Sequence, residues 1–219
     1  IYNLIKIPNL KIYELNTVNK LRYLYAQQPF TIGVDNNINC YNPEKKKLDE
    51  KYKIIKENLD RYDHKFLKKI NLKYIVLCED LSISKINTAG IPNNIMKTLI
   101  LDVQFNERYF ERVIHHEIFH IINDSYKKIF DEKIWSNFNV EEFKYAECST
   151  CTDKLGLDTY SNTDGFFTEY SKSTVSEDMA EVFSHLMIGS NLDNIDPILE
   201  NKIKFIKNNL LKIDQNFFL

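Results

Sequence analysis

The chain has 219 residues, and its 29 basic and 31 acidic residues give a formal net charge of −2. This balance offers no electrostatic case for binding nucleic acid, and no apolar run approaches the length needed to cross a bilayer. A chain of this size can bury a good core, either as one large domain or as two small lobes. We therefore expect neither a nucleic-acid partner nor a transmembrane segment in this chain.

The first half of the chain alternates between predicted strands and helices. Residues 30–34 and 73–78 favour short strands, and residues 87–94, which contain a glycine and a proline, are typical of a loop. Between the strands, residues 43–69 predict one long charged helix. Its apolar stripe consists of Leu48, Tyr52, Ile55, Leu59, Tyr62 and Phe66.

The middle of the chain predicts a strand followed by a buried helix. Residues 98–103 are rich in branched apolar side chains, and Asn106 is suited to cap a helix that begins at Glu107 and runs to about Tyr126. Apolar residues recur there at steps of three and four, so most of this helix should be buried. These residues are Phe110, Val113, Ile114, Ile118, Ile121 and Ile122.

Within this predicted helix lies the sequence His116-Glu117-x-x-His120. Residues four apart share one face of a helix, so both histidines can direct a ring nitrogen to one metal ion, while Glu117 reaches the water that the ion carries. Buried histidines and a buried glutamate need polar partners. One zinc ion would satisfy all three, whereas a purely structural interpretation needs a separate partner for each.

A catalytic zinc site needs a third protein ligand and an open position for water. The metzincin pattern would place a glycine at 123 and a histidine at 126, but the chain has Asn123 and Tyr126, which excludes that class. A second predicted helix, residues 176–187 with Ser176 as its cap, carries Glu177 and Glu181 one turn apart. We assign Glu177 to the metal and expect Glu181 to accept a hydrogen bond from a ligand histidine. The alternative is that both are solvated helix glutamates.

Together these motifs resemble known zinc peptidases. The His116-Glu117-x-x-His120 and Glu177-x-x-x-Glu181 pair resembles the gluzincin clan, and residues 170–183 are similar to a segment of the anthrax lethal factor catalytic domain. Residues 115–121, 165–170 and 177–181 together resemble a family of putative zinc-binding metallopeptidases, many of them bacterial surface lipoproteins. The resemblance covers about residues 98–190.

The resemblance adds expectations that the spacing alone does not provide. It implies that Tyr170 donates a hydrogen bond to the oxyanion, although with 13 tyrosines in the chain a packing role is the alternative. Lethal factor has a glycine at the position of Phe119, so the wall of the site beside the zinc should differ between the two proteins. The resemblance to the metallopeptidase family also implies a secreted or cell-surface protein. The chain begins with Ile1, which is compatible with a trimmed or mature form that has lost a signal or lipid-attachment segment.

We therefore predict an α+β, zincin-like fold that forms one metallopeptidase domain over residues 1–219. Its upper lobe, residues 1 to about 125, should hold a small mixed sheet with an edge strand over the active-site helix. By analogy with zincins that edge is the strand at 98–103, although its pattern equally suits a buried strand. The lower lobe, about 126–219, should be mostly helical, with a helical segment near Trp135 and a terminal helix over 197–212.

The predicted activity is that of a zinc-dependent endopeptidase, most simply a monomer that acts on a protein or peptide substrate. Zinc would activate a water, and Glu117 would take its proton as general base and return it to the leaving amine. One alternative is a non-catalytic zinc-binding surface or interaction protein that keeps the fold. Glu117 argues against it, since a structural zinc site needs no base. Another is a hydrolase of non-peptide amides or esters.

The remaining histidines and cysteines indicate less. We expect His115 to support a ligand or lie at the surface, and His185 to be packed or solvated. Cys148-x-x-Cys151 allows a local disulfide, a redox pair or half of a zinc site, and Cys40 and Cys78 lie far apart in the sequence. We favour two free or loosely bridged pairs over a second metal, because a zinc ribbon would need a second Cys-x-x-Cys pair. Four cysteines allow three full pairings, among which the sequence does not choose.

Overall fold

The computed structural model describes residues 9–192 and 195–217. The chain divides into two compact units, which we call the N-terminal unit (residues 1–121) and the C-terminal unit (residues 122–219). The first contains all the named strands and the second is mostly helical, so the fold is α+β. Our prediction that the whole chain forms a single domain stays a prediction.

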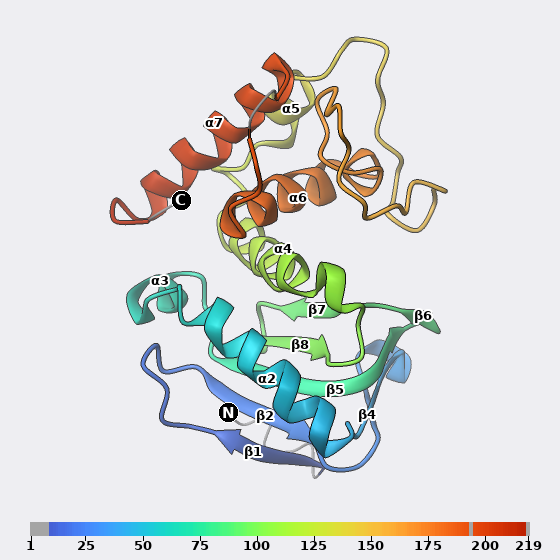
Figure 1. Cartoon of the computed structure of the whole chain (residues 1–219), viewed down its shortest axis with the longest axis vertical. Helices are drawn as coiled ribbons and strands as arrows, with labels where there is room; N and C mark the ends of the chain where they lie inside the picture. Colours follow the sequence, from blue (N-terminus) through green and yellow to red (C-terminus); the bar gives the residue numbers. More distant parts are fainter. Residues whose placement is uncertain (1–8, 193–194, 218–219) are drawn as a thin grey trace. The chain divides into compact units, whose positions relative to one another are not determined.

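Strand β5 lies at the centre of the N-terminal unit (Figure 1). Its first half pairs in parallel with β2 on one side and β8 on the other, while β1 and β7 add antiparallel strands outside them. The resulting order is β1-β2-β5-β8-β7, a mixed sheet. The strands are β1 (Leu10–Glu14), β2 (Arg22–Ala26), β5 (Tyr74–Ile83), β7 (Gly90–Asn93) and β8 (Thr98–Asp102).

The second half of β5 belongs to a separate set of strands. It pairs antiparallel with β4 (Ile38–Tyr41) and β6 (Ile86–Asn87), and β4 pairs with β3 (Phe30–Ile32). A short 3-10 helix, η1 (Val34–Asn36), joins β3 to β4. The predicted strands at 30–34 and 73–78 are therefore present, but β5 continues five residues further, to Ile83.

The predicted helix over residues 43–69 is two helices, α2 (Lys45–Leu59) and α3 (His64–Lys69). The prediction of one helix was wrong because the apolar stripe continues through the break, where Tyr62 is buried. The Asp63 side chain accepts a hydrogen bond from the Phe66 N–H and so starts a new helix. All six residues of the predicted stripe are buried.

One of the two edges of this sheet lies at β7. Strand β8 is buried at every position and pairs with both β5 and β7, so the edge role proposed for residues 98–103 was wrong. Residues 90–93, which we predicted as part of a loop, form β7, which pairs only with β8 among the described strands. A proline is tolerated there because an edge strand can leave a backbone donor unpaired.

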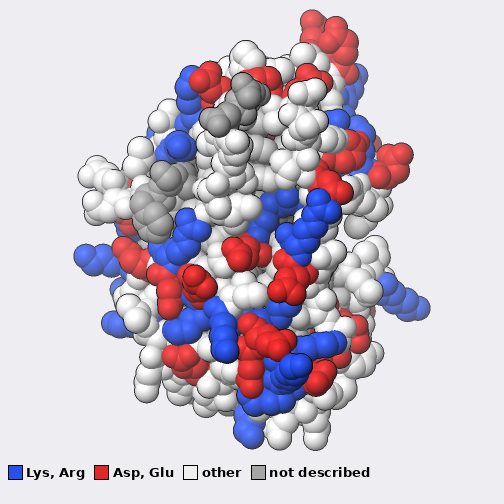
Figure 2. All heavy atoms as spheres, viewed as in Figure 1, with Lys and Arg blue, Asp and Glu red and all other residues white. Residues whose placement is uncertain are grey.

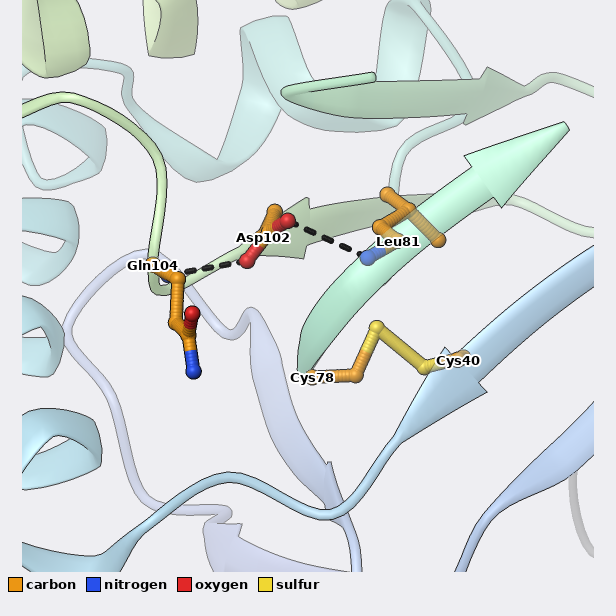
Figure 3. The surroundings of a disulfide bond; sticks show 5 residues. All are labelled: Cys40, Cys78, Leu81, Asp102 and Gln104. Atoms are coloured by element: carbon orange, nitrogen blue, oxygen red, sulfur yellow. Dashed lines mark hydrogen bonds between the residues drawn. A yellow bond between two sulfur atoms is a disulfide. The ribbon is translucent and has the colours of Figure 1, made fainter. Parts of the chain in front are cut away.

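Asp102 connects the end of β8 to the segment that leads into the next helix. Its carboxylate accepts hydrogen bonds from the backbone N–H groups of Leu81 (3.1 Å) and Gln104 (2.8 Å), as Figure 3 shows. Burial raises the pKa of this carboxyl group, and the two backbone donors oppose the shift. Helix α4 (Glu107–Ser125) follows directly, with the Asn106 side chain accepting from the Arg108 N–H. The predicted cap and helix are thus confirmed to within a residue.

The C-terminal unit contains the helices α5 (Glu132–Ser136), α6 (Val175–Met187) and α7 (Pro197–Ile213), and the 3-10 helix η2 (Tyr170–Lys172). Within the described residues, its only strand-like pairing is a bridge between Thr159 and Thr168. Helix α6 starts one residue before Ser176, because Thr174 is the cap: its hydroxyl accepts from the Glu177 N–H at 3.2 Å. Ser176 as cap was therefore wrong.

The cysteines form two disulfides, Cys40–Cys78 and Cys148–Cys151. The first joins β4 to β5 in the core of the N-terminal unit (Figure 3), and both of its residues are fully buried. The second closes a local loop in the C-terminal unit. The expectation of free or loose pairs was thus wrong for the buried bridge, whose partners are 38 residues apart in sequence but adjacent in the sheet.

We expect the two disulfides to contribute unequally to stability. A cross-link restricts the unfolded chain more when it closes a longer loop, so replacing Cys40 and Cys78 by alanine should lower the free energy of unfolding by about 4 kcal/mol. The same double change at Cys148 and Cys151 should cost about 2 kcal/mol. Urea unfolding of both double variants measures this difference, and equal losses would contradict it.

Acidic and basic side chains are interspersed on the face of the molecule seen in Figure 2, in keeping with their distribution in the sequence. Among the described residues, no helix is both long enough and apolar enough to cross a membrane.

Candidate metal centre

His116 and His120 face each other on one side of α4. Their Nε2 atoms are 3.1 Å apart and their ring centroids 4.9 Å apart. His116 is only 5% exposed. Two imidazole nitrogens directed at one point are a donor pair suited to Zn²⁺, which takes neutral imidazole readily. The helical spacing therefore brings the two predicted histidine ligands together, and the donor set fits zinc.

Glu117, the predicted base, is buried to 8% exposure beside the edge strand. A Cβ atom placed on Gly90 would lie 2.6 Å from Glu117 Cγ and 2.9 Å from Cδ, so only glycine lets the β7 backbone approach this closely. Gly90 was not among the site residues that we predicted from the sequence. A glycine inside a strand often marks such an approach, but residues 87–94 were predicted as loop.

We expect Gly90→Ala to impair turnover without removing the metal. The added methyl group must displace the Glu117 side chain, and a misplacement of about 1 Å at a catalytic group can cost about 100-fold in rate. The zinc content should stay at the wild-type value, because the three atoms nearest to the new methyl group all belong to Glu117 and not to a histidine. Steady-state cleavage of a peptide substrate, measured beside zinc content, checks this, and an unchanged kcat would mean that Glu117 is not held by β7.

His115 is fully buried and both of its ring nitrogens have partners. Its Nδ1 lies 2.6 Å from the Tyr62 hydroxyl and its Nε2 2.9 Å from Asn58 Oδ1. The Asn58 amide nitrogen donates to the Ile54 carbonyl, so its oxygen accepts from His115 Nε2–H, and Nδ1 accepts from Tyr62. Burial lowers the pKa of His115 to about 3. This neutral histidine anchors α4 and is not available as a ligand.

The predicted carboxylates Glu177 and Glu181 lie on α6, in the C-terminal unit. Glu177 is partly exposed in the first turn, where a carboxylate is favoured by the helix dipole. Glu181 is buried, and the Thr168 hydroxyl donates to its Oε2 at 2.8 Å. Its predicted hydrogen bond to a ligand histidine stays a prediction. The apolar flank of α6, Met179, Val182, Phe183, Leu186 and Met187, is buried as expected.

Tyr170 begins η2, the turn that precedes α6. Its N–H donates to the Gly156 carbonyl at 2.9 Å, and this bond ties the turn to the preceding loop. The role of its phenol stays a prediction. His185 near the end of α6 is buried, stacks on Phe167 with centroids 4.2 Å apart, and lies 2.8 Å from the Ser190 hydroxyl. The expected packing role of His185 is thus observed.

Comparison with known proteins identifies the family. Residues 30–212 match the family described as "Putative zinc-binding metallo-peptidase". The chain belongs to this family. Zinc is therefore its expected metal, and the two facing histidines of α4 supply suitable donors. A comparison with curated proteins found no match.

One solved structure is similar to this chain, that of a putative zinc-binding metallo-peptidase from Bacteroides caccae. The alignment covers 86% of this chain and 77% of that one, with 20% sequence identity and a TM-score of 0.43. The family match over residues 30–212 extends beyond residues 98–190, the part that the sequence motifs alone identified.

Proposed function

We propose that this family member is a zinc-dependent endopeptidase of the gluzincin type, with His116, His120 and Glu177 as the metal ligands. The observation that carries the proposal is the facing pair of histidine nitrogens on α4, 3.1 Å apart, with the buried Glu117 on the next residue. We propose Glu177, a carboxylate on the first turn of α6, as the third ligand that completes this pair. Two imidazoles and one carboxylate leave a position open on tetrahedral zinc.

When bound, zinc supplies Lewis-acid chemistry, which acidifies water and polarises a carbonyl group. The residues of the chain would perform the proton transfers. Glu117 accepts a proton from the attacking water on its carboxylate and later returns it to the nitrogen of the leaving amine. The Tyr170 phenol donates a hydrogen bond to the oxygen that becomes negatively charged.

The free edge of β7 suits an extended peptide substrate. The Asp102 N–H donates to the Ala89 carbonyl, and in the antiparallel register the next residues bonded to β8 are Ile91 and Asn93. The backbone groups of Gly90 and Pro92 therefore point away from β8. We propose that substrate pairs along this edge, beside Glu117. With proline at 92, the edge offers fewer backbone donors than acceptors.

We also propose that the protein acts outside the cytoplasm, at the cell surface or secreted. The two disulfides support this, because such bonds persist mainly in oxidising compartments.

A mixed peptide library, analysed by mass spectrometry, tests the proposed function. The wild-type protein should cleave internal peptide bonds, lose activity with a zinc chelator and regain it with added zinc. Zinc binding without any cleavage would support the non-catalytic alternative instead. Cleavage of ester or non-peptide amide substrates, without cleavage of peptides, would support the second alternative, a hydrolase of esters or non-peptide amides.

A further inference from the structure

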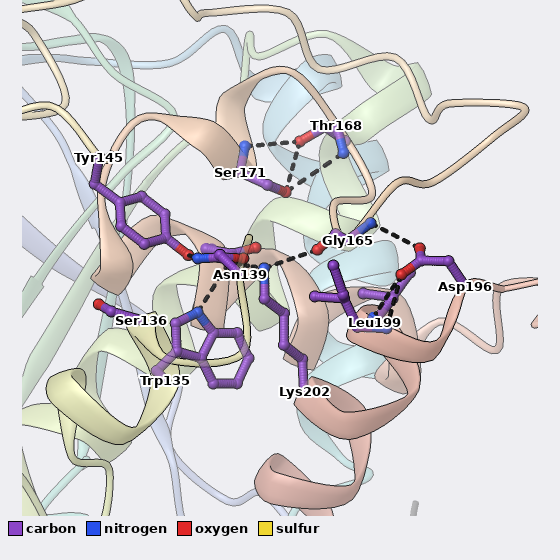
Figure 4. Close-up of polar contacts among 12 residues, drawn as sticks. Trp135, Ser136, Asn139, Tyr145, Gly165, Thr168, Ser171, Asp196, Leu199 and Lys202 are labelled. Carbon is purple, nitrogen blue, oxygen red and sulfur yellow. Dashed lines mark hydrogen bonds and ion pairs between the residues drawn. The ribbon is translucent and has the colours of Figure 1, made fainter. Parts of the chain in front are cut away.

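Lys202 on α7 has a side chain that is completely buried. Its Nζ donates to Asp178 Oδ2 at 2.7 Å and to the Gly165 carbonyl at 2.8 Å, and lies 3.8 Å from the centroid of the Phe166 ring. A buried ammonium is costly unless such partners surround it. One ammonium group therefore connects α7 to the start of α6 and to the segment that begins at Gly165 (Figure 4).

Asp178 receives further donors on the same oxygen. Trp135 Nε1 donates to Oδ2 at 2.8 Å and the Tyr145 hydroxyl at 2.6 Å. The other oxygen, Oδ1, is buried and has no hydrogen-bond partner among the described residues. Burial raises the pKa of Asp178 and lowers that of Lys202, while the attraction within the pair opposes both shifts. Three donors on one oxygen thus fix the rotation of the first turn of α6.

Gly165 is held from both sides by α7. Its N–H donates to Asp196 Oδ2 at 2.7 Å, and its carbonyl accepts from Lys202. Asp196 also caps α7, through the N–H groups of Ile198 and Leu199. Gly165 has a φ of +83°, and a Cβ there would lie 3.0 Å from Ile198 Cγ2, so the contact requires glycine.

We propose that Lys202 is a positioning residue of the peptidase site. By holding Asp178 and Gly165 on α7, it sets the orientation of Glu177, the residue before Asp178, and of the segment that leads from Gly165 to Tyr170. This inference rests on the proposed function for the roles of Glu177 and Tyr170. Stability alone is a weak reason for such a pair, because a buried ion pair is often no more stabilising than apolar residues of the same volume. Fixed geometry is what the pair adds.

Lys202→Met tests this, because methionine keeps most of the apolar stem and removes the ammonium. The double variant Asp178→Asn/Lys202→Met also removes the unpaired carboxylate that could prevent folding. The matched control is Lys204→Met, because Lys204 is an exposed lysine on the same helix that pairs with Glu200. Two quantities are measured: hydrogen exchange of the metal-free proteins and the zinc Kd by competition with a chromophoric chelator.

In both Lys202 variants, exchange should accelerate in residues 165–172 and 174–181 but not in residues 107–121 of α4. The zinc Kd should rise about 10- to 100-fold, as for other residues that hold a ligand in place. The control should match the wild type in both respects. A folded double variant with wild-type exchange and zinc Kd would overturn the inference. A wild-type protein that binds no zinc would instead contradict the proposed function, and the exchange data would still decide whether Lys202 holds these segments.

Discussion

Glu117→Gln should abolish peptide cleavage while zinc stays bound. Glutamine keeps the shape and burial of the side chain against Gly90 but cannot accept a proton from water. A positioned general base contributes about 10²- to 10⁴-fold to rate, so kcat/KM should fall by at least that order. The substitution leaves His116 and His120 unchanged, and their Nε2 atoms lie 3.1 Å apart in the wild-type structure. The number of zinc ions bound per chain should therefore be the same in the variant.

The matched control is Glu111→Gln, an exposed glutamate six residues earlier on the same helix. This variant should cleave the substrate at the wild-type rate. Substrate turnover and zinc content, measured on the same samples, provide the comparison. Appreciable cleavage by Glu117→Gln would exclude Glu117 as the base.

Glu177→Ala should weaken zinc binding and abolish cleavage together. Residues that only orient a ligand typically contribute 10- to 100-fold to metal affinity, so loss of a ligand should raise the zinc Kd by more than about 100-fold. Chelator competition measures this. Glu200→Ala on α7, an exposed glutamate of the same unit, should bind zinc as the wild type does. If Glu177→Ala kept full zinc affinity, the third ligand would lie elsewhere.

Local periodicity was enough to predict the central part of the candidate site. The facing histidines follow from a spacing of four residues on a helix whose apolar pattern is regular. The apolar stripes of α2, α4 and α6 were also predicted, because each depends on side chains within one element, whereas strands β1, β2 and β4 were not predicted. The α2 to α3 break was missed because the apolar pattern continues across it, although α2 ends at Leu59 and the capping residue Asp63 starts a new helix.

The remaining features depend on contacts between residues far apart in the chain. Residues 90–93 resemble a loop by composition and become a strand only because β8 pairs with them. Cys40 and Cys78 become neighbours through the pairing of β4 with β5. A lysine in an amphipathic helix is normally solvated, so the burial of Lys202 has no local signal.

The central claim is that one zinc ion is bound by His116, His120 and Glu177. Anomalous diffraction at the zinc absorption edge, from crystals of the zinc-loaded protein, tests it most directly. We expect one anomalous peak per chain, bonded to both Nε2 atoms and to the Glu177 carboxylate at about 2.0–2.2 Å. A peak away from the α4 histidines, or a zinc ion bound there with Glu177 directed elsewhere, would contradict the proposed site.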